Sequence, residues 1–174
     1  MDTLEAIYTR RSVRDFTQDV VSKMDVQDLL KAGMQAPSAK NERPWHFIVI
    51  NDPDVLHAVP SFHPHAKMLF DATLAILVCS DRHLELKRAS WIQDCSAATE
   101  NILLAAHAKG LGAVWLGVFP DADRVQGMQT LLALPPEIRP MALVAVGHPA
   151  SRPEAIDRYD ESRVHYNGWR GISK

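Results

Sequence analysis

The chain has little cysteine and no cysteine motif. Its 174 residues include only Cys79 and Cys95, which lie in separate apolar runs. This excludes a disulfide-built scaffold and favours two buried, reduced thiols, as in a cytosolic protein. Residues 1–5 are acidic and lack the apolar core of a signal peptide. No apolar run reaches the roughly 20 residues that span a bilayer. We therefore expect a cytoplasmic protein with no membrane partner.

The sequence also lacks an excess of charge of either sign. Its formal net charge is −2, with 47% hydrophobic and 23% charged residues, which is ordinary for a globular protein. No global basic field draws such a chain to nucleic acid, so we expect no nucleic-acid partner. There is no repeat, low-complexity segment or dividing linker. We expect one domain over residues 1–174, long enough to bury a real core.

Several familiar catalytic motifs are missing. There is no Walker loop, no Gly-x-Ser-x-Gly and no His-Glu-x-x-His. Gly110 and Gly112 follow a helical pattern and precede a strand, the reverse of a dinucleotide-binding loop. Asp94 and Glu100 are expected on different faces of one helix, which argues against paired catalytic carboxylates. Three histidines close in sequence could ligate a metal, but few carboxylates lie nearby, so a surface loop is favoured; they are His57, His63 and His65.

Hydrophobic patterning predicts helices alternating with short strands. Helices are expected at 3–9, 23–35, 55–59, 91–109 and 122–132, and strands at 46–51, 73–80, 113–116 and 141–146. The run 73–80 is apolar throughout, which suits a strand covered on both faces. Ser22 is the expected N-cap of the second helix. The fold class is α+β, or α/β in three layers. The expected buried stripe of the second helix is Met24, Val26, Leu29, Leu30 and Ala32.

Two segments are unusually rich in polar donors. The first places Arg10, Arg11, Ser12 and Arg14 at the end of the first helix. Guanidinium groups and a hydroxyl suit phosphate oxygens, although arginines could also complement the helix dipole in a solvated turn. The second segment, residues 36–45, is a loop with two prolines that runs into a strand. Together they suggest a phosphorylated ligand.

These segments resemble the flavin-binding signature of the nitroreductase family. Residues 10–16 resemble its Arg-x-Ser-x-Arg/Lys motif, and residues 36–47 are similar to its Ala-Pro-Ser-x-x-Asn-x-Gln-Pro-Trp loop, with Arg43 replacing the usual Gln. Residues 94–112 resemble the long central helix and its Gly-Leu-Gly exit. Residues 115–117, 147–150 and 158–160 resemble the remaining landmarks. The landmarks follow the family order and span nearly the whole chain.

The resemblance implies a fold and a cofactor. The fold is a central, mostly antiparallel sheet of about four to five strands flanked by helices, in an intertwined homodimer that binds FMN at its interface. Arg14 would lie beside the flavin N1 and C2 oxygen, where a cation stabilises the anionic reduced ring. The other implied contacts are Arg10, Arg11, Ser12 and Arg158 for the phosphate and ribityl chain, Pro37, Ser38, Ala39 and Asn41 from the other subunit, the backbone of Leu116 and Gly117 near N5, and His65 and Lys67 at the ring.

The implied activity is an FMN-dependent oxidoreductase. Hydride would pass from NADH or NADPH to the flavin, and a nitroaromatic, quinone or other electron-poor acceptor would then take the electrons in a ping-pong cycle. No catalytic protein nucleophile or essential cysteine is expected. Alternatives are a specialised branch, such as reductive dehalogenation or flavin fragmentation, and a non-catalytic FMN-binding redox sensor. Residues 83–91 are the expected lid. The usual acidic residue beside the strand-end glycine is Leu116 here, so only its backbone role carries over.

Overall fold

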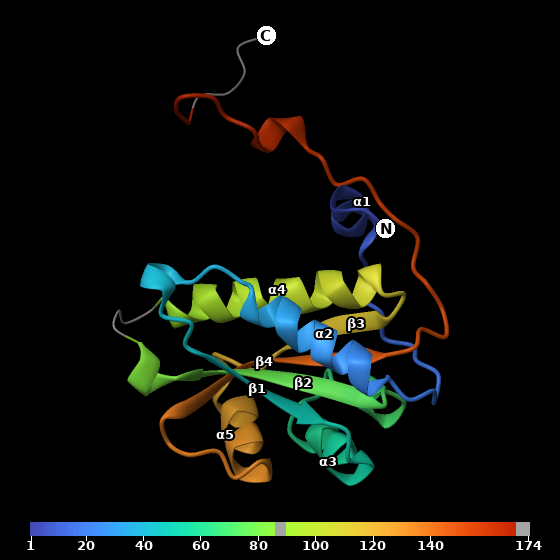
Figure 1. Cartoon of the computed structure of the whole chain (residues 1–174), viewed down its shortest axis with the longest axis vertical. Helices are drawn as coiled ribbons and strands as arrows, with labels where there is room; N and C mark the ends of the chain where they lie inside the picture. Colours follow the sequence, from blue (N-terminus) through green and yellow to red (C-terminus); the bar gives the residue numbers. More distant parts are fainter. Residues whose placement is uncertain (86–89, 170–174) are drawn as a thin grey trace.

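A sheet of four antiparallel strands forms the middle layer of the computed structural model, which describes residues 1–85 and 90–169 (Figure 1). Within that range the strand order is β1-β2-β4-β3, so the last two strands along the chain lie in reversed order in the sheet. Every neighbouring pair is antiparallel. The strands are β1 (Trp45–Ile50), β2 (Leu74–Asp81), β3 (Gly112–Gly117) and β4 (Ile138–Gly147).

The central strands are buried on both faces. Residues 74–80 of β2 are all buried, as the apolar run predicts. β2 pairs with β1 on one side, where Trp45 lies opposite Ser80, and with β4 on the other, where Leu74 lies opposite Val146. A register shift between Val78 and Cys79 interrupts the second pairing. β3 is the outer strand beside β4.

All the α-helices of the described residues except the longest, Trp91–Ala108, begin at a capping side chain. The Ser22 hydroxyl accepts a hydrogen bond from the Asp25 N–H, which confirms the predicted cap. Asp52 caps the third helix with Pro53 in its first turn, so this helix begins before the predicted residue 55. The helices are α1 (Thr3–Thr9), α2 (Lys23–Met34), α3 (Pro53–Ala58), α4 (Trp91–Ala108) and α5 (Ala122–Leu131).

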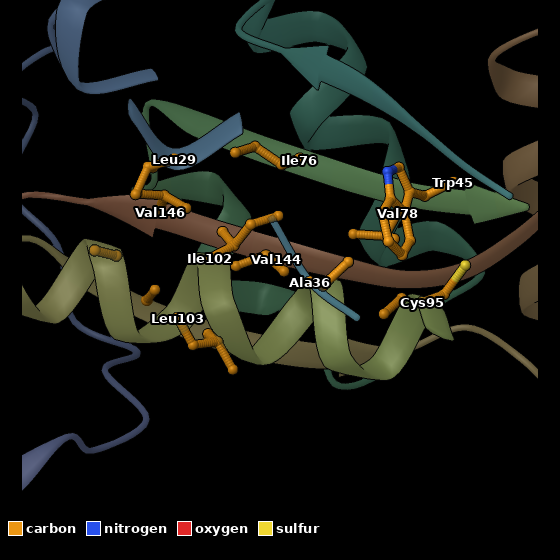
Figure 2. Packing of buried hydrophobic residues seen from close by; sticks show 14 of the residues in the cluster. Leu29, Ala36, Trp45, Ile76, Val78, Cys95, Ile102, Leu103, Val144 and Val146 are labelled. Carbon is orange, nitrogen blue, oxygen red and sulfur yellow. The ribbon is translucent and has the colours of Figure 1, made fainter. Parts of the chain in front are cut away.

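The helices cover the sheet from both sides and give the three-layer arrangement. α2 and α4 pack on one face, and α3 and α5 lie on the other (Figure 1). Figure 2 shows side chains of α2 and α4 meeting the inner strands, with Leu29, Ile102 and Val144 among them. All three are fully buried, and burying one such side chain contributes roughly 1.5–3 kcal/mol.

One predicted stripe is only partly buried. Leu29 is fully buried in α2, and Val26 and Leu30 pack against the core at its margin. Met24, however, is 69% exposed, so its place in the stripe is wrong. It lies in the first turn of α2, two residues after the capping Ser22. The exposed side chain of Met24 therefore lies outside the buried face of the helix.

The C-terminal segment lies outside the layers. After β4, residues 151–163 are exposed and run past α1 (Figure 1). The Arg11 guanidinium donates to the carbonyl oxygens of Glu154 at 2.9 Å and Ile156 at 2.8 Å, which ties the segment to the end of α1. Tyr159 and Trp169 are largely exposed. A long exposed segment with large aromatic side chains is typical of a surface that meets another protein.

Candidate functional site

The arginine segment contacts the outer edge of the sheet, at β3. Ser12 forms a parallel bridge with Ala113 of β3, and the Val13 N–H donates to the Ala113 carbonyl at 3.0 Å. The Arg10 guanidinium lies 3.2 Å from a Glu100 carboxylate oxygen on α4. Arg14 is exposed. The segment is therefore fixed by its backbone, while the Arg10 side chain reaches α4 and the Arg11 side chain reaches the tail.

Three of the predicted phosphate contacts line one cavity. A hollow of about 750 Å³ lies between α1 and the tail, and Arg10, Arg11 and Arg158 contribute to its wall. Arg11 already donates to the Glu154 and Ile156 carbonyls of the tail. Its guanidinium therefore holds together two segments that both carry arginines. A cavity with this lining offers charged donors suited to an anion.

The loop after α2 is held in a strained conformation. Lys40, Asn41 and Arg43 have φ values of 51°, 57° and 48°, a left-handed region that Asn tolerates more readily than Lys or Arg. Such residues cost on the order of 1–3 kcal/mol each and persist where surrounding contacts hold them. The Ser38 hydroxyl accepts from the Arg43 N–H at 2.9 Å. Strain of this kind is concentrated at functional sites.

Asp94 anchors the same loop from α4. One of its carboxylate oxygens accepts a hydrogen bond from the Ala39 N–H at 2.9 Å. Asp94 is 5% exposed, and its second oxygen is buried without a hydrogen-bond partner among the described residues. Both carboxylate oxygens of Glu42, which lies in the loop, are also buried without a hydrogen-bond partner among the described residues. Asp94 contacts the loop whereas Glu100 pairs with Arg10, so the two carboxylates of α4 face different partners, in line with the prediction, and Asp94 helps to position the loop.

The end of β3 has open space beside its last residue. Leu116 is buried, whereas Gly117 is half-buried. A Cβ atom placed on Gly117 would meet nothing within 4 Å. The glycine is therefore not required by packing within this chain. Its missing side chain leaves room for a flat ligand to approach the backbone.

The histidines do not form the single surface loop expected from the sequence. The His57 ring lies tilted against the Phe70 ring, with centroids 5.4 Å apart, and His65 and Lys67 are both exposed. His63 is only 1% exposed, so its assignment to the surface is wrong. Its Nε2 lies 3.0 Å from the Gly117 carbonyl oxygen, a contact across 54 positions that no local pattern reveals. Over residues 1–85 and 90–169, no cluster of three potential ligands could hold a metal ion.

Neither cysteine is suited to nucleophilic chemistry. Cys79 and Cys95 are free, fully buried thiols, as the sequence predicts. Burial raises the pKa of each to about 12. At neutral pH both are therefore protonated, and the thiolate needed for attack is absent.

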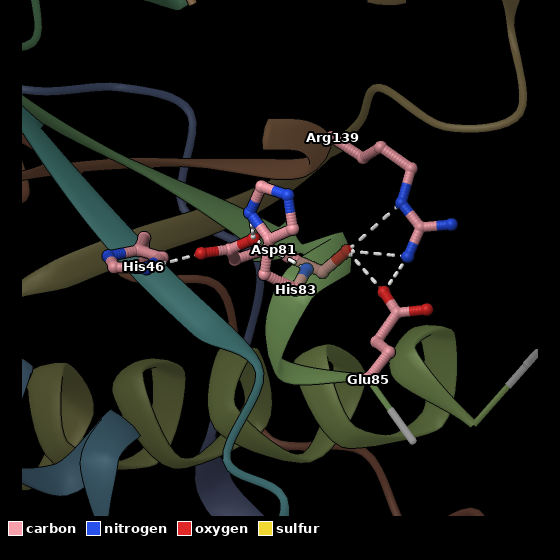
Figure 3. A network of polar contacts seen from close by, with 6 residues as sticks. His46, Asp81, His83, Glu85 and Arg139 are labelled. Atoms are coloured by element: carbon pink, nitrogen blue, oxygen red, sulfur yellow. Dashed lines mark hydrogen bonds and ion pairs between the residues drawn. The ribbon is translucent and has the colours of Figure 1, made fainter. Parts of the chain in front are cut away.

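A cluster of polar side chains lies at the end of β2 (Figure 3). The Arg139 guanidinium donates to the Ser80 hydroxyl, pairs with Glu85 and lies over the Trp91 ring at 4.2 Å. Trp91 in turn meets the Phe119 ring edge-on. The cluster therefore links the end of β2, the start of α4 and the chain beyond Gly117. The predicted lid, residues 83–91, has its middle at 86–89, which lies outside the described residues.

The two signature segments occupy different positions along α4. Asp94 contacts the loop at Ala39, and Glu100 contacts Arg10. Six residues of α-helix correspond to about 9 Å of rise. Within one chain, the arginine segment and the loop are thus anchored about two helical turns apart.

Among residues 1–85 and 90–169, none of the helices has the length and hydrophobicity of a membrane-spanning segment.

Comparison with known proteins defines the family. The nitroreductase family model matches residues 7–69 and 61–148. A protein of Methanothermobacter thermautotrophicus, provisionally named NADH dehydrogenase/NAD(P)H nitroreductase, is 46% identical over 97% of this chain and 88% of its own length. The chain belongs to the nitroreductase family. The predicted α+β class and family are thereby confirmed.

Solved structures give the same result for the fold. A provisionally named NADH dehydrogenase/NAD(P)H nitroreductase from Parabacteroides distasonis superposes with a TM-score of 0.92 at 40% identity, covering 96% of this chain and 98% of that one. A provisionally named nitroreductase from Desulfovibrio desulfuricans, solved in complex with FMN, superposes with a TM-score of 0.84 at 34% identity. The match covers 98% of this chain and 99% of that one.

Proposed function

We propose that this chain is an FMN-dependent oxidoreductase that takes hydride from NADH or NADPH and passes electrons to a small, electron-poor organic acceptor. The observation that carries the proposal is the likeness to the Desulfovibrio desulfuricans structure, which contains FMN and matches 98% of this chain. The relative in Methanothermobacter thermautotrophicus is named for NAD(P)H chemistry. The fold, the family and the names of the relatives therefore all support oxidoreduction that depends on FMN and NAD(P)H.

The residues present fit the cofactor. Arg10, Arg11 and Arg158 line one cavity and supply cationic donors for a phosphate. The open space at Gly117 admits a flat ring against the strand end. Bound FMN supplies the hydride-accepting and electron-donating chemistry. The protein's tasks are to hold the phosphate, to orient the ring against the backbone of β3 and to exclude water.

The proposed site requires two subunits. The loop with Pro37, Ser38, Ala39 and Asn41 would reach the flavin held by the arginine segment of the other chain. Within one chain the two segments are anchored at different residues of α4, the loop at Asp94 and the arginine segment at Glu100. A shared site gives a reason for the unpartnered carboxylate oxygens of Glu42, because a partner chain or cofactor can complete their contacts.

Identification of the bound flavin and its reduction test the proposal. The purified protein is expected to be yellow and to release FMN, not FAD, when it is denatured. Under anaerobic conditions, NADH or NADPH should rapidly bleach the flavin absorbance, and an added quinone or nitroaromatic should restore it. A flavin that neither nucleotide reduces would contradict the enzymatic proposal and favour the redox-sensor alternative.

A further inference from the structure

The carbonyl oxygen of Gly117 accepts hydrogen bonds from two side chains that are distant from each other in sequence. His63 Nε2 and Arg124 Nη1 each lie 3.0 Å from this oxygen. A carbonyl oxygen has two lone pairs, and both are therefore occupied. The N–H of the same peptide, at Val118, donates to the Met141 carbonyl at 3.2 Å. The last peptide of β3 is thus held from both sides.

His63 reaches this oxygen from a buried position. Its backbone N–H donates to the Val59 carbonyl at 3.0 Å, which fixes the residue after the short helix at Val59–Ser61. Burial lowers the pKa of His63 below its ordinary value, so the ring is neutral at pH 7. Donation to a carbonyl then places the proton on Nε2. Nδ1 has no hydrogen-bond partner among the described residues, so Nε2 is the ring nitrogen that ties His63 to β3.

Arg124 reaches the same oxygen from α5. It lies in the first turn of that helix, and Asp121 accepts a hydrogen bond from its backbone N–H at 3.1 Å. The second carboxylate oxygen of Asp121 lies 3.3 Å from Arg124 Nε. The helix cap therefore also orients the guanidinium. Two independent elements converge on one backbone atom.

The held peptide lies where the proposed cofactor meets the chain. The Val13 N–H bonds the Ala113 carbonyl at the outer edge of β3. Backbone groups of alternate strand residues point to the same side, so the N–H and C=O of Gly117 point to that edge as well. The arginine segment contacts this edge, and the space beside Gly117 is open.

We propose that His63 and Arg124 are positioning residues for the flavin, which clamp the Gly117 carbonyl and thereby fix the backbone at the end of β3 in the orientation that meets the ring. The inference rests on the proposed FMN site. It adds two residues that belong to neither signature segment. Their effect is transmitted through the Gly117 peptide, without contact between either side chain and the flavin.

The test measures the affinity of flavin-free protein for FMN by fluorescence titration. His63→Phe and Arg124→Met each remove one donor, and each is expected to raise the dissociation constant about tenfold. In the double variant the dissociation constant for FMN should rise by less than the product of the two single-variant factors, because both donors act on one atom. His63→Gln retains an N–H near the position of Nε2 and should bind FMN within about threefold of wild type.

Two further measurements separate positioning from general damage. His57→Phe is the matched control, since His57 lies in the same stretch of chain but contacts Phe70 instead of Gly117; its FMN affinity should equal that of wild type. The midpoint potential of the bound flavin should shift in His63→Phe and Arg124→Met but not in the control. Thermal unfolding of the flavin-free proteins verifies that Arg124→Met, at a partly exposed position, remains folded.

The outcomes distinguish this inference from the proposed function. If wild type binds FMN and both single variants retain its affinity and potential, the clamp is refuted while the proposed function stands. If His63→Gln loses as much affinity as His63→Phe, the hydrogen bond is not what His63 supplies. If wild type itself does not bind FMN, the proposed function fails first.

Discussion

At the scale of single residues, the two thiols couple stability to alkaline pH. Cys95 Sγ donates to the Cys79 carbonyl at 3.6 Å, and both residues are fully buried. Burial raises their pKa from 9.0 to about 12. Above pH 9 the unfolded chain releases protons that the folded chain retains. The contribution of the thiols is therefore complete below pH 9 and is lost as the pH rises toward 12.

The Cys79→Ala/Cys95→Ala double variant should lose this pH dependence. Each titrating thiol contributes a slope of at most about 1.4 kcal/mol per pH unit between the two pKa values. We expect the unfolding free energy, measured in urea from about pH 8 to about pH 11, to fall more steeply in wild type than in the variant. The alanines lower stability at every pH by removing buried atoms, so the slope is the readout. If the unfolding free energies of wild type and variant fall with pH at the same slope, the stabilising role given to the raised thiol pKa values is contradicted.

The site residues differ in how far the sequence predicted them. Arg10, Arg11 and Arg158 belong to short patterns that the sequence displays, and the structure brings them to one cavity. His63 and Asp94 were noticed in the sequence, but the contacts that they make were not predicted. Their partners, Gly117 and Ala39, lie 54 and 55 positions away. Only the packing of the elements creates these contacts, so the periodicity of a segment carries no information about them.

At the scale of elements, most of the secondary structure was predictable from the sequence. Each of the four strands contains an apolar run that the sequence displays, because β2 and β4 are covered on both faces along most of their length. β4, however, begins at Ile138, three residues before its predicted start. Of the five α-helices named above, all but α3 begin and end within one residue of the prediction. α3 begins at Pro53 because Asp52 caps it, a local signal that periodicity does not report. Strand order β1-β2-β4-β3 depends on tertiary packing and was not predicted.

The position of α5 depends on a close contact with the loop that carries His63. A Cβ atom on Gly127 would lie 2.3 Å from Phe62 Cδ2, so no side chain fits between the helix and the ring. Phe62 precedes His63, and Gly127 follows Arg124 by about one turn. The glycine therefore permits the approach that brings both donors to the Gly117 carbonyl.

Gly127→Ala should separate these elements. The gain in helix propensity, about 1 kcal/mol, is expected to be outweighed by overpacking, which costs typically 1–3 kcal/mol. The predicted result is a lower midpoint in urea unfolding together with weaker FMN binding. Gln126→Ala is the control, because Gln126 is exposed on the same helix; its stability should remain within about 0.5 kcal/mol of wild type. If the Gly127→Ala protein is more stable than wild type, the Phe62 ring moves aside without loss of stability, and the expected overpacking is contradicted.

At the scale of the whole molecule, a single chain leaves several large apolar and aromatic side chains exposed. Ile7 and Tyr8 of α1, and Tyr159 and Trp169 of the tail, are all exposed. Large apolar side chains grouped on one helix and an adjoining segment are typical of a surface buried in an assembly. The proposed homodimer would give such a surface a function, since each flavin would take the arginine segment from one chain and the loop at Ala39 from the other.

Mixing two inactive variants tests whether sites are shared. Arg14→Ala and Asn41→Ala are each expected to bind FMN weakly, because each alters both sites of a homodimer. When the two are unfolded together and refolded, about half of the dimers are mixed, and each mixed dimer carries one site in which both residues are intact. About a quarter of all sites should then recover wild-type affinity in an FMN titration. Each variant refolded alone is the control. If Arg14 and Asn41 served the same chain's site, every site would retain one substitution and the mixture would recover nothing.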